Sequence, residues 1–343
     1  MLTDTPPQPK PADGAAALPA EAWRRELAAA IDDPAELLAR LGLPASLHAP
    51  AAARCFPLRV PPGFVARMRP GDPDDPLLRQ VLPRAEEAAE APGFTADPLA
   101  ERGRGDGPGL LAKYAGRSLV VATGGCALHC RYCFRRGFPY AEHGGWRAAL
   151  QRLEAEGAPA EVILSGGDPL LLDDAALGEC LERLAALPGV RRVRIHSRLP
   201  VAVPARVTAA LAERLAGTPL QTAVVVHANH PNEIDAAAAA ALRRLGAATG
   251  ALLNQAVLLR GVNDDAATLE ALSERLFEAG ALPYYLHLLD PVAGAAHFEV
   301  DEAAGRRLVD ALARRLPGYL VPRLAREEPG AAAKTVLAAG LTG

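Results

Sequence analysis

The chain has 343 residues, of which 50% are hydrophobic and 22% are charged, a balance that predicts a folded protein with a substantial core. Its formal net charge of −3 provides no basic field that would draw it to nucleic acid or to an anionic membrane. No apolar run approaches the length of a membrane span, and residues 1–20 lack the basic-then-apolar pattern of a signal peptide. The five cysteines are odd in number and three are clustered, which argues against a disulfide scaffold and favours a reducing cytoplasm.

The N-terminal third predicts helices and irregular chain rather than a sheet. Residues 1–18, rich in proline and alanine, are expected to form a disordered tail. Helical periodicity follows over 21–30 and 34–41, where Pro34 suits a first helical position. From 57 to 108 proline and glycine are so frequent that only short elements fit, among them a helix opening within 72–80. Residues 19–109 are therefore expected to form a helical and irregular arm that wraps another domain.

After Gly109, β-rich runs alternate with helical runs rich in alanine and leucine. Strands are expected at 118–122, 161–164, 193–196, 222–227, 253–258 and 284–288. Helices are expected at 146–156, 175–187, 207–215, 234–245, 267–279 and 301–315. Six β–α repeats predict an α/β fold with a parallel sheet covered by helices. Polar residues gather at the C-terminal strand ends, where α/β barrels place their active sites.

Three cysteines lie within eight residues, at Cys126, Cys130 and Cys133, after a predicted strand and a Gly-Gly pair. Three thiolates on one loop can hold three irons of a [4Fe–4S] cluster and leave the fourth iron open. A zinc site would need a fourth ligand, for which His129 is poorly placed between two of the cysteines, and three unligated buried thiols are the other alternative. Cys55 and Cys180 are expected to be small core residues.

The C-x3-C-x2-C spacing resembles that of the radical S-adenosylmethionine (SAM) superfamily. This resemblance implies a partial (β/α)6 TIM-like barrel over residues 110–326, with SAM bound at the open iron. Gly166-Gly167-Asp168 match the Gly-Gly-acid motif that contacts the methionyl amino group of SAM in that family, although the same residues also suit a simple turn. Further strand-end residues are assigned loosely to SAM, namely His196, Ser197, Asn229, His230 and Gln255.

The chain further resembles lysine 2,3-aminomutases, in which a glycine-rich tail delivers a lysine that forms a Schiff base with pyridoxal 5′-phosphate (PLP). Lys334, in the C-terminal segment 327–343, matches that lysine, although the segment is poorer in glycine than is usual in the family. Lys113, Tyr114 and Arg117 match the segment that holds PLP, with Arg117 suited to its phosphate. Taken alone, Lys334 would be a solvated lysine and the second stretch a surface turn.

The same resemblance implies the residues that bind the substrate. Arg135 matches the arginine that pairs with the carboxylate of the substrate amino acid, and Asp290 and Glu327 match two acids that receive the distal ammonium of lysine. The family carries aspartate where Glu327 stands, so the reach of this side chain is longer. The alternatives are a solvated Arg135-Arg136 pair and a structural aspartate at a strand end.

Stretches at 72–82, 130–140, 196–200 and 318–327 resemble the branch of the family that serves bacterial elongation factor P (EF-P). Catabolic members carry threonine where Phe134 stands and have a cysteine-bearing zinc tail, whereas no cysteine follows Cys180 here. The resemblance thus implies an isomerase that converts L-lysine to β-lysine, an electron donor such as flavodoxin or ferredoxin, and a separate ligase that attaches β-lysine to EF-P. A homo-oligomer is possible. The alternatives are a catabolic lysine 2,3-aminomutase, a radical SAM enzyme without PLP, and a non-catalytic iron–sulfur module.

Overall fold

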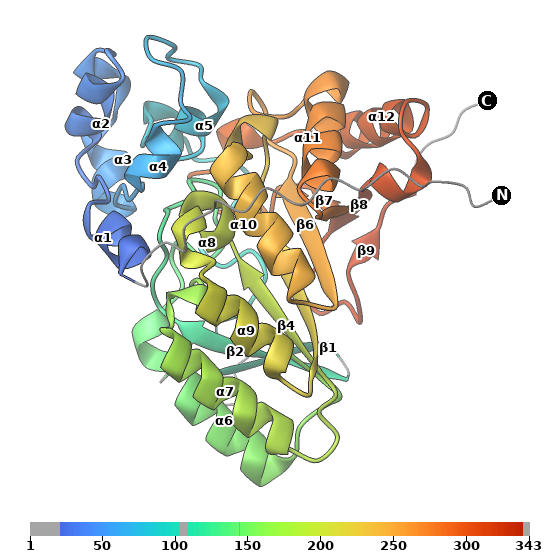
Figure 1. Ribbon diagram of the computed structural model, residues 1–343. Coiled ribbons are helices and arrows are strands. Elements are labelled where there is room, and N and C mark those ends of the chain that lie inside the picture. Colours follow the sequence, from blue (N-terminus) through green and yellow to red (C-terminus); the bar gives the residue numbers. More distant parts are fainter. Residues whose placement is uncertain (1–20, 103–108, 115, 144, 339–343) are drawn as a thin grey trace, which may run out of the picture.

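The computed structural model describes residues 21–102, 109–114, 116–143 and 145–338 (Figure 1). The tail expected at 1–18 lies outside these residues. Among the residues that are described, no helix combines the length and the apolar composition that crossing a bilayer requires.

The described residues form one nine-stranded sheet in which the spatial order of the strands follows the sequence. Strands β2 to β8 pair in parallel, while β1 and β9 add antiparallel edges. The strands are β1 Leu110–Tyr114, β2 Arg117–Thr123, β3 Glu161–Gly166, β4 Arg192–Ser197, β5 Gln221–Val226, β6 Ala251–Val257, β7 Leu282–His287, β8 Arg323–Arg326 and β9 Thr335–Val336. The six predicted strands correspond to β2 to β7, so the predicted α/β class with a parallel, partial barrel is confirmed.

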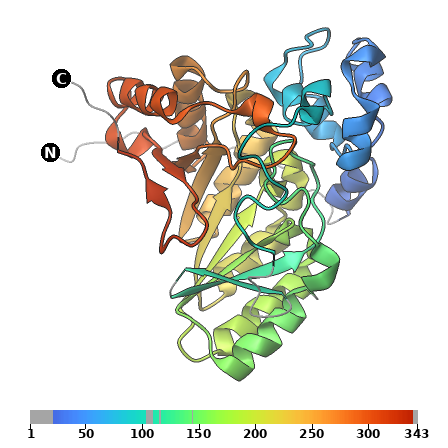
Figure 2. The same ribbon diagram turned by 180° about the vertical axis from the view of Figure 1, so that it is seen from behind.

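Six longer helices connect the parallel strands: α6 Gly145–Glu156, α7 Asp174–Ala186, α9 Ala209–Gly217, α10 Ala236–Ala247, α11 Ala266–Glu278 and α12 Glu302–Ala313. Each matches a predicted helical run, and their starts are fixed locally because α7 and α9 to α12 begin at an aspartate or threonine whose side chain accepts a backbone N–H. Helices α9, α10 and α11 lie in front of the sheet in Figure 1, and the turned view in Figure 2 shows the strands in front of them.

The arm consists of short helices that lie beside the barrel (Figures 1 and 2). They are α1 Ala22–Ala28, α2 Pro34–Arg40, α3 Pro50–Cys55, α4 Pro62–Val65 and α5 Pro76–Arg79. Arg67 fastens the arm, because its guanidinium donates to the carbonyls of Val201 and Glu233, each at 2.7 Å, and pairs with Asp235. Short 3₁₀ turns and the four-residue helix α8 Leu199–Ala202 complete the described elements.

The two isolated cysteines differ from each other. Cys180 is fully buried within α7, as predicted. The prediction of a buried Cys55 is wrong, because this residue is exposed. Cys55 is the last residue of the six-residue helix α3, which is too short to bury more than Ala52.

Candidate active site

A cavity of about 310 Å³ lies within the barrel. Its wall includes the C-terminal ends of the parallel strands and reaches along their inner side to Arg117 and Arg194. The three clustered cysteines line it from the loop after β2, and Lys334 lines it from the residue before β9. The two segments expected to carry the cluster ligands and the PLP lysine therefore face the same space.

The geometry of the cysteine loop separates the metal alternatives. His129 is engaged elsewhere, because its Nδ1 lies 2.9 Å from the carbonyl oxygen of Pro57 and its ring stacks on Phe56. Among the described residues, no three His, Cys, Asp or Glu side chains converge on a point that a single metal ion would occupy. A [4Fe–4S] cube places its irons at separate corners, so three spread thiols on one loop suit it better than they suit one zinc ion.

Burial controls the protonation of these thiols. It raises the pKa of Cys133 to about 11 and that of Cys126 well above its ordinary value, and the positive charge of Arg135 opposes both shifts. Without a cluster, the thiols of Cys126 and Cys133 are therefore protonated near neutral pH. Because iron binds the thiolate, cluster assembly has to release these protons.

The turn after β3 packs directly on the cysteine loop. A Cβ atom on Gly167 would lie 2.2 Å from the carbonyl oxygen of Gly125, and Gly166 has a φ of +99°, so both positions require glycine. The close approach leaves the backbone of this turn beside the loop of the three cysteines.

The carboxylate of Asp168 serves the fold. Its Oδ1 accepts from Ser197 Oγ at 2.7 Å and from the Leu170 N–H, and its Oδ2 accepts from the N–H groups of Arg198 and Leu199 at 2.8 and 2.9 Å. Four donors occupy the acceptor sites of one carboxylate. A bound ammonium, as predicted for SAM, would have to displace one of them, and the Ser197 hydroxyl is likewise engaged.

Two histidines on the cavity wall are held neutral. Burial lowers the pKa of His227 to about 3 and that of His196 well below its ordinary value. Gln255 Nε2 lies 3.2 Å from His227 Nε2, whereas His196 Nε2 is buried with no hydrogen-bond partner in the described part of the chain. An orphaned polar atom on a cavity wall fits a ligand that offers a hydrogen-bond group at that position.

The other strand-end residues assigned loosely to SAM lie differently. Asn229 lines the cavity, and its side-chain nitrogen donates to Gln80 and Tyr132 at 2.9 and 2.6 Å within a buried network. His230 accepts from the N–H of Asn232 and so caps the 3₁₀ turn Pro231–Glu233.

Lys334 is only 18% exposed, so it is not a solvated lysine. Its Nζ lies 3.1 Å from Glu327 Oε1, 3.1 Å from His287 Nε2, and 4.9 Å from the centre of the Tyr285 ring. The adjacent strand β9 pairs with β8 through Arg326↔Thr335, which fixes the position of the lysine. Pairing at the sheet edge thus positions this segment despite its low glycine content.

A second group of cationic and aromatic side chains lies at the β1–β2 hairpin. The Tyr114 hydroxyl donates to Glu327 Oε2 at 3.0 Å, and the Arg117 guanidinium lies over the Tyr114 ring. Burial and the nearby carboxylate raise the pKa of Tyr114 well above its ordinary value, so it remains a donor. The side chain of Lys113 lies outside the part that the structure describes.

The cavity wall also contains two arginine nitrogens that fit an anionic ligand. The Nε atoms of Arg117 and Arg194 are buried and have no hydrogen-bond partner among the described residues. Arg194 also pairs with Glu161 at 2.8 Å. A phosphate accepts from several N–H groups at once, so these arginine nitrogens suit an anionic group such as a phosphate.

Arg135 lines the cavity and is 8% exposed, which excludes the solvated alternative. Its Nε and one terminal nitrogen donate to Glu101 at 2.7 and 2.9 Å, and its other terminal nitrogen lies 3.3 Å from Ser165 Oγ. Asp290, after β7, also lines the cavity. Three further residues of the site, Glu101, His287 and Arg194, carry no local sequence signal, and only the folded chain brings them to the cavity or to the residues that line it.

No family model matches the chain. L-lysine 2,3-aminomutase of Escherichia coli (strain K12) is 50% identical over 324 residues, which cover 92% of this chain and 94% of that protein. The chain belongs to the L-lysine 2,3-aminomutase family. The L-lysine 2,3-aminomutase of Haemophilus influenzae is 47% identical over 322 residues, covering 92% of this chain and 95% of that one.

Membership of the L-lysine 2,3-aminomutase family makes the chain an isomerase. Among solved structures, a radical SAM methyltransferase from Sphaerobacter thermophilus is 22% identical and covers 63% of this chain and 68% of that chain. The TM-score of this match is 0.46.

Proposed function

We propose that this chain is a radical SAM, PLP-dependent isomerase that moves the 2-amino group of L-lysine to C3 and yields β-lysine. One observation carries the proposal: the thiols of Cys126, Cys130 and Cys133 and the amine of Lys334 line a single cavity of about 310 Å³. That volume lies at the lower end of the range usual for small-molecule sites. A sheltered lysine in the same cavity as the cluster loop favours a PLP-dependent enzyme over a radical SAM enzyme without PLP.

The residues divide by the group that each would hold. The three cysteines would hold [4Fe–4S], the backbone at Gly166 and Gly167 and the orphaned His196 nitrogen would face SAM, and Lys334, Tyr114, Arg117 and Arg194 would hold PLP. When bound, the cluster and SAM supply one-electron hydrogen abstraction, with an electron from a donor such as flavodoxin or ferredoxin, and PLP supplies a carbonyl group for the amine. The barrel positions the reacting atoms and limits access of water.

Lys334 can act only as a neutral amine, and its neighbours provide for the loss of a proton. His287 Nε2, at 3.1 Å from Nζ, is within reach to accept that proton. Glu327, also at 3.1 Å, holds the amine in place when it is charged. The contact between Nζ and Glu327 also supports the proposal that this carboxylate receives the distal ammonium of the substrate.

The two ends of L-lysine would be held by opposite charges. Arg135 would take the α-carboxylate, with Glu101 fixing the plane of its guanidinium. Asp290 and Glu327 would take the distal ammonium, with Glu327 oriented by the hydroxyl of Tyr114. Charges at both ends place the reacting carbons between them.

The modification of EF-P is the cellular role that we propose. It is supported by the four stretches that resemble the EF-P branch and by the near-complete coverage of the Escherichia coli and Haemophilus influenzae relatives. A ligase would then attach the product to EF-P in the cytoplasm.

The test is anaerobic incubation of reduced, reconstituted protein with SAM, PLP and L-lysine, followed by mass spectrometry for β-lysine. We expect Cys130→Ala to lose both the cluster and turnover, and turnover retained in that variant would refute the assignment. Adding EF-P and its ligase separates the two parts of the proposal. If β-lysine forms but is not transferred to EF-P, the proposed isomerase activity stands and the proposed role in EF-P modification is refuted.

A further inference from the structure

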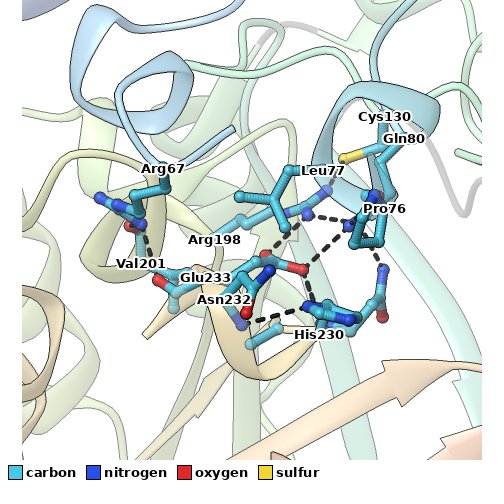
Figure 3. Close-up of polar contacts among 12 residues, drawn as sticks. Arg67, Pro76, Leu77, Gln80, Cys130, Arg198, Val201, His230, Asn232 and Glu233 are labelled. Carbon is cyan, nitrogen blue, oxygen red and sulfur yellow. Dashed lines mark hydrogen bonds and ion pairs between the residues drawn. The ribbon is translucent and has the colours of Figure 1, made fainter. Parts of the chain in front are cut away.

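The first residue after β4, Arg198, reaches the sulfur of a cluster cysteine (Figure 3). One terminal nitrogen of its guanidinium lies 2.7 Å from Cys130 Sγ and 2.6 Å from the hydroxyl of Tyr132. We infer that Arg198 is a positioning residue that raises the reduction potential of the iron–sulfur cluster through its charged hydrogen bond to Cys130 Sγ. The inference rests on the proposed function, because it requires a cluster on that sulfur.

A buried network fixes the guanidinium in this position. Its other terminal nitrogen donates to Gln80 Oε1 at 2.7 Å and to Glu233 Oε2 at 2.9 Å. Glu233 is fully buried, and its second oxygen accepts from the Asn229 N–H at 2.9 Å and from the Gln80 side chain at 3.1 Å. Since Gln80 belongs to the arm, the arm and two strand ends together hold Arg198 against the sulfur (Figure 3).

The electrostatic consequence follows from burial. Arg198 is 9% exposed and permanently charged, so its field at the sulfur is weakly screened. Reduction adds one electron to a [4Fe–4S] cluster and makes it more negative, so a fixed positive charge stabilises the reduced form more than the oxidised form. Hydrogen bonds to the sulfurs and local net charge are known determinants of cluster potential. Glu233 partly offsets the positive charge, and its removal should act in the opposite direction.

The experiment is a redox titration of the reconstituted holoenzyme with dithionite, which delivers electrons one at a time as the SO₂ radical anion, followed by EPR of the reduced cluster. We expect Arg198→Gln to lower the equilibrium constant for reduction about tenfold, which is about 59 mV for a one-electron couple. Glu233→Gln should raise it. Arg67→Gln is the matched control, because Arg67 donates to the carbonyl of Glu233 but, in the described part of the chain, makes no hydrogen bond to the Cys130 sulfur, and this variant should leave the potential unchanged.

The signs distinguish charge from structural loosening. Water that enters a loosened site favours the more charged, reduced cluster, so a fall in Arg198→Gln cannot arise that way. If Arg198→Gln does not hold the cluster, the double variant Arg198→Gln/Glu233→Gln is used, because it leaves no unpaired buried charge. It is compared with Glu233→Gln, and a tenfold fall in the equilibrium constant for reduction is again expected. If the variant that lacks Arg198 has the same cluster potential as the protein it is compared with, the inference about Arg198 is overturned and the proposed function is not. If the wild-type protein binds no cluster, the proposed function is overturned as well.

Discussion

Lys334 is a residue whose surroundings determine its chemistry. Its amine faces the cavity between Glu327 and His287, and an aromatic ring lies below it. The chain contains three lysines, Lys10, Lys113 and Lys334, so the site of PLP attachment can be mapped without ambiguity.

We therefore predict that borohydride reduction of the PLP-loaded protein labels Lys334, as read by peptide mass spectrometry. Lys334→Ala should lose the absorbance of bound PLP and essentially all turnover, because no other amine takes its place. Lys113→Arg is the matched control and should keep the label on Lys334. Label on Lys113 in the wild-type protein would contradict the assignment.

Glu327 is the carboxylate that we expect to recognise the distal ammonium. A hydrogen bond to a charged group contributes about 1.5–3 kcal/mol, so Glu327→Gln should raise KM for L-lysine by about 10- to 150-fold. Tyr114→Phe, which removes one neutral donor to the same carboxylate, should have an effect of about fivefold. The measurement is initial rate against L-lysine concentration, and an unchanged KM in Glu327→Gln would remove this residue from the substrate site.

At the scale of elements, Asp168 joins the end of β3 to the start of α8. An asparagine there keeps only one oxygen, so in either orientation of its amide at least one buried backbone donor, the Leu170 N–H or those of Arg198 and Leu199, loses its acceptor, and each orphaned buried donor costs about 1–3 kcal/mol. We predict that Asp168→Asn lowers the free energy of unfolding of the cluster-free protein by about 3 kcal/mol in urea. Asp173→Asn is the control, because asparagine caps α7 as well as the exposed aspartate does. Equal stability of the two variants would show that Asp168 does not hold these elements together.

The same scale shows what the sequence could predict. The barrel strands and helices were found because each long helix carries its own periodicity and most carry a capping side chain. The two edge strands could not be predicted from sequence. The two residues of β9 form a strand only because they pair with β8, and β1, which directly follows the irregular arm, has no sequence pattern that sets it apart from the arm. The cysteines and Lys334 were found by spacing and resemblance. Glu101 accepts a hydrogen bond from Arg135, which lies 34 residues later in the sequence, and no local sequence pattern predicts this contact.

For the whole molecule, the arm supports the cluster loop. Glu87, on the arm, accepts two hydrogen bonds from the fully buried Arg131, at 2.8 and 2.5 Å, and one from Arg136 at 2.7 Å. Both arginines follow cluster cysteines, and both guanidinium groups lie over the ring of Phe56. The loop that would hold the metal therefore depends on an ion-pair network supplied from another part of the chain.

Breaking this ion-pair network should weaken the contact between the arm and the cysteine loop of the barrel. Glu87→Gln leaves Arg131 buried without its counter-charge, and loss of one partner of a buried ion pair typically costs about 3–5 kcal/mol. We predict a lower Tm for the cluster-free protein and faster loss of iron from the reconstituted enzyme, measured by chelator-trapped iron over time. Glu86→Gln, at the exposed neighbouring position, is the control and should change neither value. A Glu87→Gln enzyme that retained its iron as long as the control would show that the cysteine loop keeps its shape without the arm.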